Sequence, residues 1–93
     1  MHTPIQRREI LYNGMVQGVG FRFSTRRMAQ RFDVTGFVMN LPDGRVKLVV
    51  EGTPKEIERF LGDIESELGG YIAQTEQDTQ PATGELRSFE IRL

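Results

Sequence analysis

The sequence predicts an α+β domain in which two helices cover one face of an antiparallel β-sheet. Two segments carry apolar residues at helical spacing, and four others show the alternation or flanking turns that are typical of strands. These segments follow one another in the order β-α-β-β-α-β. Each helix has a single apolar stripe to bury, so both are expected on the same face of one sheet.

The first strand is expected over residues 10–16, where apolar side chains partly alternate. Residues 17–20 interrupt it, because two glycines in four positions favour a turn. A first helix follows over residues 22–31. Its expected buried stripe consists of Phe21, Thr25, Met28, Ala29 and Phe32.

Residues 34–41 and 45–51 are expected to pair as a hairpin, because Pro42-Asp43-Gly44 between them is a turn sequence. The run Thr53–Glu56 then begins the second helix with an N-cap, a proline at the first helical position and a capping-box glutamate. Gly69-Gly70 ends this helix. Its expected buried stripe consists of Ile57, Phe60, Leu61, Ile64 and Leu68.

A fourth strand can begin over residues 71–75, and alternation over residues 89–93 predicts a closing strand. The polar residues 74–87 give no clear pattern. This element order, with both helices on one face, is the ferredoxin-like split β-α-β arrangement. We expect one domain over residues 1–93 with a frayed N-terminus over residues 1–7. Many unrelated functions use this fold, so the function must be argued from a site.

Composition excludes several classes of chemistry. The chain of 93 residues has no cysteine, which rules out disulfides, thiolate catalysis and cysteine-based zinc sites. Its one histidine, His2, lies in the segment expected to be frayed, so neither a histidine metal cluster nor a Ser-His-Asp triad can form within one chain. No apolar run has the length of a membrane span or a signal peptide. We expect a cytoplasmic protein.

The net charge of −1 conceals an uneven distribution of charge along the chain. Residues 1–47 contain eight basic and three acidic side chains, for a net charge of +5, whereas residues 48–93 contain four basic and ten acidic ones, for −6. An isoelectric point near 5.8 argues against a protein that coats nucleic acid. The basic half still predicts a local surface that attracts a small anion. Arg26, Arg27 and Arg31 are expected to form a solvated helix face.

The junction between the first strand and the first helix is the first candidate site. Its sequence, Gly14-Met15-Val16-Gln17-Gly18-Val19-Gly20-Phe21-Arg22, places a glycine loop at a helix start, where unpaired backbone N–H groups form a concave array. The helix dipole adds about half a positive charge, and the Arg22 guanidinium can hold two phosphate oxygens. A tight turn beside a solvated arginine is the plain alternative. The expected phosphate-binding residues are Gln17, Gly18, Val19, Gly20, Phe21 and Arg22.

Asn40 is the second candidate, at the end of the strand that opens the hairpin. In a split β-α-β unit the first two strands are parallel with one strand between them, so their carboxyl ends share one sheet edge at a separation of roughly 10 Å. A phosphoryl group and one water fit between Asn40 and the glycine loop. The amide has both a donor and an acceptor, so it can orient a water. A simple turn-forming role is the alternative.

The side chains available at such a site favour a substrate whose leaving group departs without protonation. No buried histidine, cysteine or evident carboxylate pair is present for proton transfer. A phosphate monoester normally requires a metal or a general acid. An acyl phosphate instead releases a carboxylate, whose conjugate acid has a pKa of about 4, so it leaves without protonation. Positioning and charge stabilisation are then sufficient.

Two sequence motifs resemble the signatures of the acylphosphatase family. The run Gly14–Arg22 resembles the first, and Gly36-Phe37-Val38-Met39-Asn40, followed by Gly44-Arg45-Val46 and Gly52, resembles the second in both sequence and spacing. The similarity covers essentially residues 8–93 and is weakest across residues 74–87. One mild departure from the family pattern is Tyr12, where an aliphatic residue is expected.

The resemblance implies a ferredoxin-like fold and hydrolysis of the carboxyl-phosphate bond without a metal or other cofactor. It also implies that Arg22 binds the phosphoryl group and that Asn40 orients the attacking water. The partners implied are a small acyl phosphate as substrate and inorganic phosphate as product. We expect a monomer with neither a nucleic-acid nor a membrane partner.

Two rival functions use the same element order. An RNA-recognition domain stacks bases on aromatic residues of its central strands, and residues 45–51 contain none. A non-catalytic phosphate-binding or regulatory module is the stronger rival, because it keeps the glycine loop without useful turnover. Phosphate affinity without hydrolysis distinguishes that module from an enzyme.

Overall fold

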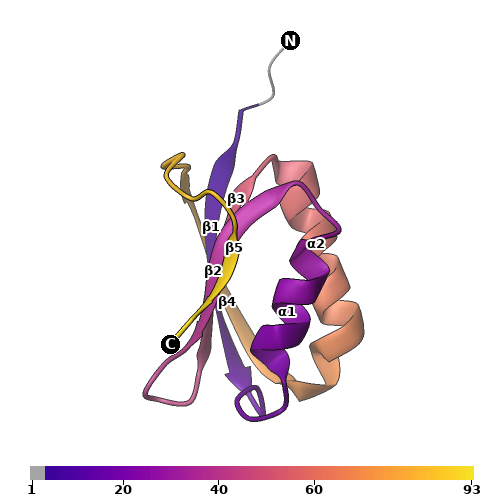
Figure 1. Ribbon diagram of the computed structural model, residues 1–93. Coiled ribbons are helices and arrows are strands. Elements are labelled where there is room, and N and C mark those ends of the chain that lie inside the picture. The colour runs from indigo at the N-terminus through magenta and orange to yellow at the C-terminus, as the bar shows by residue number, and fades with distance from the viewer. Residues whose placement is uncertain (1–3) are drawn as a thin grey trace.

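Five strands form one sheet, and two helices lie side by side against one of its faces (Figure 1). The computed structural model describes residues 4–93, so His2, which belongs to the segment expected to be frayed, lies outside the described residues. A single 3-10 turn, Gly69–Tyr71, follows the second helix. The remaining elements are β1 (Gln6–Gly14), α1 (Phe21–Ala29), β2 (Val34–Asn40), β3 (Val46–Gly52), α2 (Pro54–Leu68), β4 (Ile72–Pro81) and β5 (Phe89–Arg92). Neither helix in residues 4–93 combines the length and hydropathy needed to cross a membrane.

The strand order is β4-β1-β3-β2-β5. Strand β3 is antiparallel to both β1 and β2, so β1 and β2 are parallel with β3 between them. This confirms the ferredoxin-like α+β fold and the expected hairpin. The sheet is antiparallel except at one edge, where β5 runs parallel to β2. The reason is that β4 ends beside the start of β1, so the chain enters β5 from the end at which β2 also begins.

Two strands extend beyond their predicted bounds. Strand β1 begins at Gln6, and within the expected frayed segment Gln6 and Arg7 pair with Gly52 and Glu51 of β3. Strand β4 continues through the polar residues to Pro81, pairing with β1 along its whole length. Both extensions consist of polar residues, and β4 lies at an edge of the sheet. Because these segments bury few apolar side chains, their sequences lack the alternation of apolar and polar residues by which a strand is predicted.

The core lies between the helices and the sheet, as the helical stripes predict. In α1 the buried residues are Phe21, Thr25, Met28 and Ala29, and in α2 they are Ile57, Phe60, Ile64 and Leu68. Phe32 and Leu61 are partly buried against this core. The solvated face expected for α1 is also present: Arg31 and Arg27 are exposed and pair with Asp63 at 3.0 Å and Glu67 at 3.4 Å.

The N-cap of α2 forms as predicted, but its capping box does not close. The hydroxyl of Thr53 accepts a hydrogen bond from the N–H of Glu56 at 3.3 Å. The carboxylate of Glu56, which a capping box directs back to Thr53, accepts from the N–H of Asp33 at 2.9 Å. Glu56 therefore links the start of α2 to the turn that precedes β2.

Candidate active site

The loop between β1 and α1 presents the start of a helix without a side-chain cap. Gly20 occupies the N-cap position in the left-handed region, with φ of 76°, and Gly18 has φ of 80°. A Cβ on either glycine would meet no atom within 4 Å, so glycine is favoured there for its backbone conformation and not for space. The first turn of α1 also contains no acidic residue. Its N–H groups are therefore available to an anion.

A pocket of about 240 Å³ lies against this helix start. It is large enough for a phosphoryl group and a water, since a water occupies about 30 Å³. Its lining unites most of the predicted site, although Gln17 and Val19 lie outside it. The lining residues are Val16, Gly18, Gly20, Phe21, Arg22, Phe23 and Asn40.

Arg22 lines the pocket half-buried, and within residues 4–93 it forms no ion pair with a carboxylate. Most of the other arginines do form one. The arginines paired in this way are Arg7, Arg8, Arg27, Arg31, Arg45 and Arg59. A half-buried guanidinium without a carboxylate partner has its donors free for a bidentate contact with an oxyanion.

Asn40 ends β2 and lines the same pocket. Its Oδ1 is buried and has no hydrogen-bond partner among the described residues, a property shared only by the hydroxyl of Thr25 there. The adjacent turn is closed by backbone bonds, from the N–H of Leu41 to the oxygen of Arg45 at 2.8 Å and from Gly44 to Leu41 at 3.1 Å. Asn40 is thus not the turn-forming residue. A buried acceptor without a partner is costly unless a water or ligand completes its bond.

Gln17 has a role that sequence reasoning missed. Its side-chain Nε2 donates to the carbonyl oxygens of Leu41 at 2.9 Å and Arg45 at 3.0 Å. These two bonds join the β1–α1 loop, which leads to Arg22, to the turn that follows Asn40. No signal in the sequence could have shown this contact, because the partners lie 24 and 28 residues away and offer only backbone oxygens.

Tyr12, where the sequence departs from the family pattern, packs against the first residue of α1. Its side chain is buried, and its ring lies 5.4 Å from that of Phe21 at an interplanar angle of 56°. Burial raises the pKa of Tyr12 well above its usual value, and the Glu65 carboxylate raises it further. Tyr12 therefore stays neutral and acts as a packing residue beneath the first turn of α1.

The charge at the pocket comes from one side chain. Arg22 is the single charged residue of the lining, and the helix start adds partial positive charge to it. Within residues 4–93, no group of three or more histidine, aspartate or glutamate side chains is arranged to hold a metal ion. The arrangement can bind a small anion and place an amide beside it.

Comparison with known proteins identifies the family. The acylphosphatase family model matches residues 8–91. An acylphosphatase from Rubrobacter xylanophilus is 40% identical over 88 residues, which are 94% of this chain and 80% of the relative. One from Mycobacterium sp. (strain JLS) is 41% identical over 81 residues, 86% of each chain. The crystal structure of acylphosphatase from Bacillus subtilis superposes with a TM-score of 0.86 at 25% identity, covering 95% of this chain and 99% of that one.

The matched region is nearly the whole chain. It contains both the glycine loop with Arg22 and the strand that ends at Asn40. Agreement of sequence, strand order and overall fold shows that the chain belongs to the acylphosphatase family.

Proposed function

We propose that the chain hydrolyses the carboxyl-phosphate bond of acyl phosphates without a metal ion, by in-line attack of one water. Membership of the acylphosphatase family supports acyl phosphate hydrolysis as the reaction. The observation that carries the finer proposal is the pocket lined by both Arg22 and Asn40. It offers an anion site and a side-chain amide at one place.

The phosphoryl group is bound by the Arg22 guanidinium and by the backbone N–H groups of residues 17–22. These donors contact the equatorial oxygens of phosphorus. As bond breaking shifts charge onto the departing carboxylate and the phosphoryl oxygens, contacts with fixed donors become more favourable than in the ground state. Within residues 4–93 Arg22 forms no ion pair with a carboxylate, which supports this role.

Asn40 holds the attacking water opposite the leaving group. An oriented water avoids much of the entropy cost of bringing a nucleophile to phosphorus. Among the residues that the structure describes, the Oδ1 of Asn40 has no hydrogen-bond partner, which supports its use by a water. The new bond joins the water oxygen to phosphorus while the bond from phosphorus to the acyl oxygen breaks. The products are a carboxylate and inorganic phosphate, and the water protons pass to phosphate and solvent.

No general acid is required, because the leaving group is a carboxylate that is stable without a proton at neutral pH. This property of the substrate is also the reason that no metal enters the proposal. The cytoplasmic location, the monomeric state and the absence of nucleic-acid and membrane partners stay predictions from the sequence.

The proposal is tested by hydrolysis of acetyl phosphate in the presence of a chelator. We expect undiminished turnover by the wild type and a loss of roughly 10²–10³ in rate for Arg22→Ala and for Asn40→Ala. Arg26→Ala is a matched control, since Arg26 lies one turn further along α1 outside the pocket. Asn13→Ala is the matched amide control, because Asn13 is exposed and contacts Gln74.

Normal rates for both Arg22→Ala and Asn40→Ala would contradict the roles assigned to them. Loss of wild-type turnover on chelation would contradict the metal-free reaction. Binding of inorganic phosphate without hydrolysis of acetyl phosphate would instead favour the non-catalytic phosphate-binding module.

A further inference from the structure

Strand β5 forms one edge of the sheet, beside β2 (Figure 1). The N–H and C=O groups of successive residues in a strand point to opposite sides. The carbonyl oxygen of Ser88 accepts from the N–H of Gly36 at 2.9 Å, so this alternation directs the backbone groups of Ser88 and Glu90 toward β2. The N–H and C=O groups of Phe89 and Ile91 therefore point away from the sheet, where a further strand can pair with them.

A groove of about 590 Å³ runs between this edge and α1. Its apolar lining comes from α1, from the turn and strand that follow α1, and from β5. A strand added to β5 would continue the sheet beside α1, so every second side chain of that strand would enter the groove and remove apolar surface from water. The apolar lining residues are Ala29, Phe32, Val34, Phe89 and Ile91, and all but Ala29 are only partly buried against the core.

Positive side chains without a carboxylate partner surround this edge. Within residues 4–93, five of the twelve arginine and lysine side chains form no ion pair, and three of these five lie at β5 or across the groove. Arg26 lines the groove from α1, and Arg87 lies two residues before β5. Arg92 ends β5, with its guanidinium 3.7 Å from the ring centre of Phe37 on the other face of the sheet. The single carboxylate of β5 and of the groove lining is Glu90, so the edge carries net positive charge and attracts an acidic partner.

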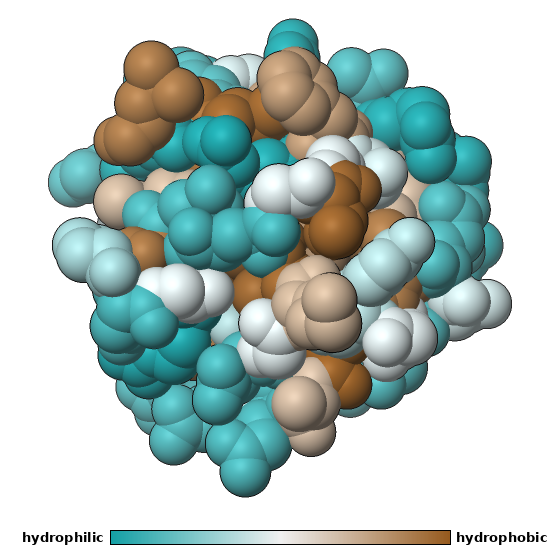
Figure 2. Space-filling view, turned by 90° about the horizontal axis from the view of Figure 1, so that it is seen from below, coloured by the Kyte–Doolittle hydropathy of each residue, from teal (hydrophilic) through white to brown (hydrophobic). Residues whose placement is uncertain are grey.

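The groove is separate from the candidate active site. Among the described residues, none lines both pockets. The candidate active site belongs to the end of the molecule that Figure 2 faces, where β1 leads into α1, whereas the groove follows β5 along the side of the sheet. A partner in the groove therefore leaves Arg22 and Asn40 accessible.

We propose that β5 and this groove form a docking site for an extended acidic peptide segment of another protein, which pairs with β5 as a sixth strand. Main-chain hydrogen bonds to Phe89 and Ile91 provide the affinity, and alternate side chains of the segment provide the specificity. An apolar side chain of the segment fills the groove. A glutamate or aspartate two positions along the segment lies on the same face and pairs with Arg26.

The probe for this site is the synthetic peptide acetyl-Glu-Thr-Ile-Thr-Leu-Thr-Asp-amide, whose apolar and acidic side chains all fall on one face of a strand. We expect the protein to bind it with a Kd of about 100 µM, a weak value because the free peptide loses conformational freedom on pairing. In an NMR titration the backbone amides of β5 should shift, and those of Phe89 and Ile91 should exchange more slowly with solvent. A peptide with lysine in place of both acidic residues should bind at least about tenfold more weakly.

Two charge reversals and a modified peptide test the contacts. Arg26→Glu places a negative charge on the groove and should weaken binding of the acidic peptide about tenfold. Lys55→Glu is the matched control and should keep the affinity within about twofold. Lys55 is an exposed cation of α2, lies outside the groove and also forms no ion pair within residues 4–93. A peptide N-methylated at its isoleucine, central threonine and leucine keeps its side chains but lacks the N–H groups for pairing, so it should not bind at about 1 mM.

Failure of the wild type to bind the acidic peptide at about 1 mM overturns the proposal. Equal binding of the N-methylated peptide, or equal weakening by the two charge reversals, overturns it as well. Because an acidic peptide can also meet Arg22, the titration is repeated with Arg22→Ala and in saturating inorganic phosphate. Unaltered affinity in both supports the groove, whereas amide shifts confined to the β1–α1 loop contradict it. Neither result depends on hydrolysis of acetyl phosphate, so this test is independent of the proposed function.

Discussion

The side-chain amide of Gln17 donates to the carbonyl oxygen of Leu41 at 2.9 Å, which ties the β1–α1 loop to the residue directly after Asn40. A second bond, to the carbonyl oxygen of Arg45, holds the same amide from the other side of the turn. The two halves of the proposed site come from different parts of the chain, and Gln17 is a side chain that joins them directly.

Removal of the Gln17 side chain should reduce turnover strongly while changing the free energy of unfolding only slightly. We expect Gln17→Ala to reduce kcat on acetyl phosphate by about tenfold to a hundredfold, because small displacements between a nucleophile and its target have effects of that size. The free energy of unfolding should fall by less than about 2 kcal/mol, since the lost bonds are neutral and exposed. Gln30→Ala, at an exposed glutamine just after α1, is the control. Equal kcat values for the two variants would show that Gln17 does not position the site.

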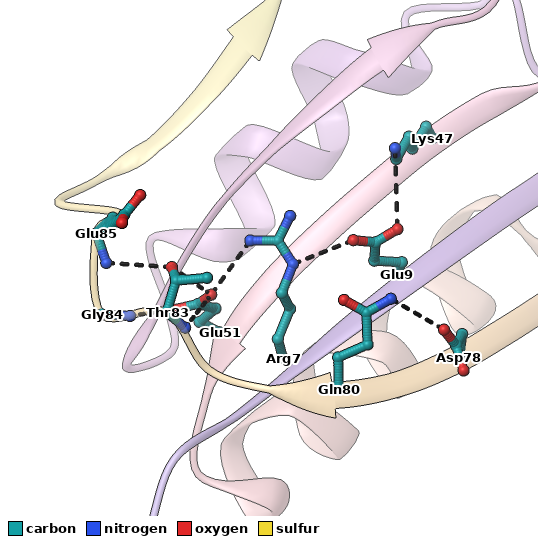
Figure 3. Close-up of polar contacts among 9 residues, drawn as sticks. All are labelled: Arg7, Glu9, Lys47, Glu51, Asp78, Gln80, Thr83, Gly84 and Glu85. Carbon is teal, nitrogen blue, oxygen red and sulfur yellow. Dashed lines mark hydrogen bonds and ion pairs between the residues drawn. The ribbon is translucent and has the colours of Figure 1, made fainter.

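A buried carboxylate fixes the loop between β4 and β5, at the end of the sheet where β1 begins. Glu51 is 2% exposed and accepts from the N–H and hydroxyl of Thr83 at 2.9 and 3.0 Å, from the N–H of Gly84 at 3.1 Å and from Arg7 at 3.2 Å (Figure 3). Burial alone raises the pKa of Glu51, but these hydrogen bonds outweigh it and hold the pKa below its usual value.

Stability should therefore depend on pH through Glu51. A carboxyl whose pKa is lower in the folded state stabilises the fold above its unfolded pKa of about 4.3, and this contribution is lost as the pH falls through the folded pKa. We expect Glu51→Gln to lower the free energy of unfolding by about 1–3 kcal/mol at pH 7. The difference from the wild type should shrink at pH 3. Urea denaturation at both values measures it.

Hydrogen exchange separates this local effect from a global one. In Glu51→Gln the N–H groups of Thr83 and Gly84 should exchange faster at pH 7, because they lose a charged acceptor. Glu85→Gln changes an exposed carboxylate of the same loop and should leave both rates unaltered. Unchanged exchange in Glu51→Gln would mean that this carboxylate does not hold the loop.

The sequence was sufficient for features that depend on local pattern. The stripes of α1 and α2 and the N-cap at Thr53 follow from spacing along the chain, and the structure confirms them. The approach of Arg22 and Asn40 followed from topology, since parallel strands with one strand between them bring their carboxyl ends to one edge. That these two residues line one pocket was thus predictable without any side-chain detail.

Features that depend on long-range polar contacts were not predictable. Strand β4 is exposed at the edge of the sheet, so its polar residues do not alternate with apolar ones. Glu51 is buried because a loop more than thirty residues away supplies its donors. The same applies to the carboxylate of Glu56, which accepts from the N–H of Asp33 in a preceding turn and not from its own N-cap. In each case the residue type permits many partners, and the fold selects one.

Two exposed glycines, one in the β1–α1 loop and one in α2, provide a test in which a change to alanine has opposite effects on stability. Gly20 has φ of 76° with open space around it, so Gly20→Ala is opposed by backbone conformation alone. We expect a loss of about 1–2 kcal/mol in the free energy of unfolding. Gly62 lies exposed within α2, also with open space, and Gly62→Ala should stabilise by about 0.5–1 kcal/mol.

Phosphate affinity distinguishes the two variants further. If Gly20→Ala relieves its strain by moving the loop, the N–H groups at the start of α1 lose their arrangement and inorganic phosphate binds more weakly. Gly62→Ala leaves the loop untouched and should bind phosphate as the wild type does. Titration with inorganic phosphate measures both. Unaltered stability and affinity in Gly20→Ala would show that the left-handed conformation at Gly20 is not required for the anion site.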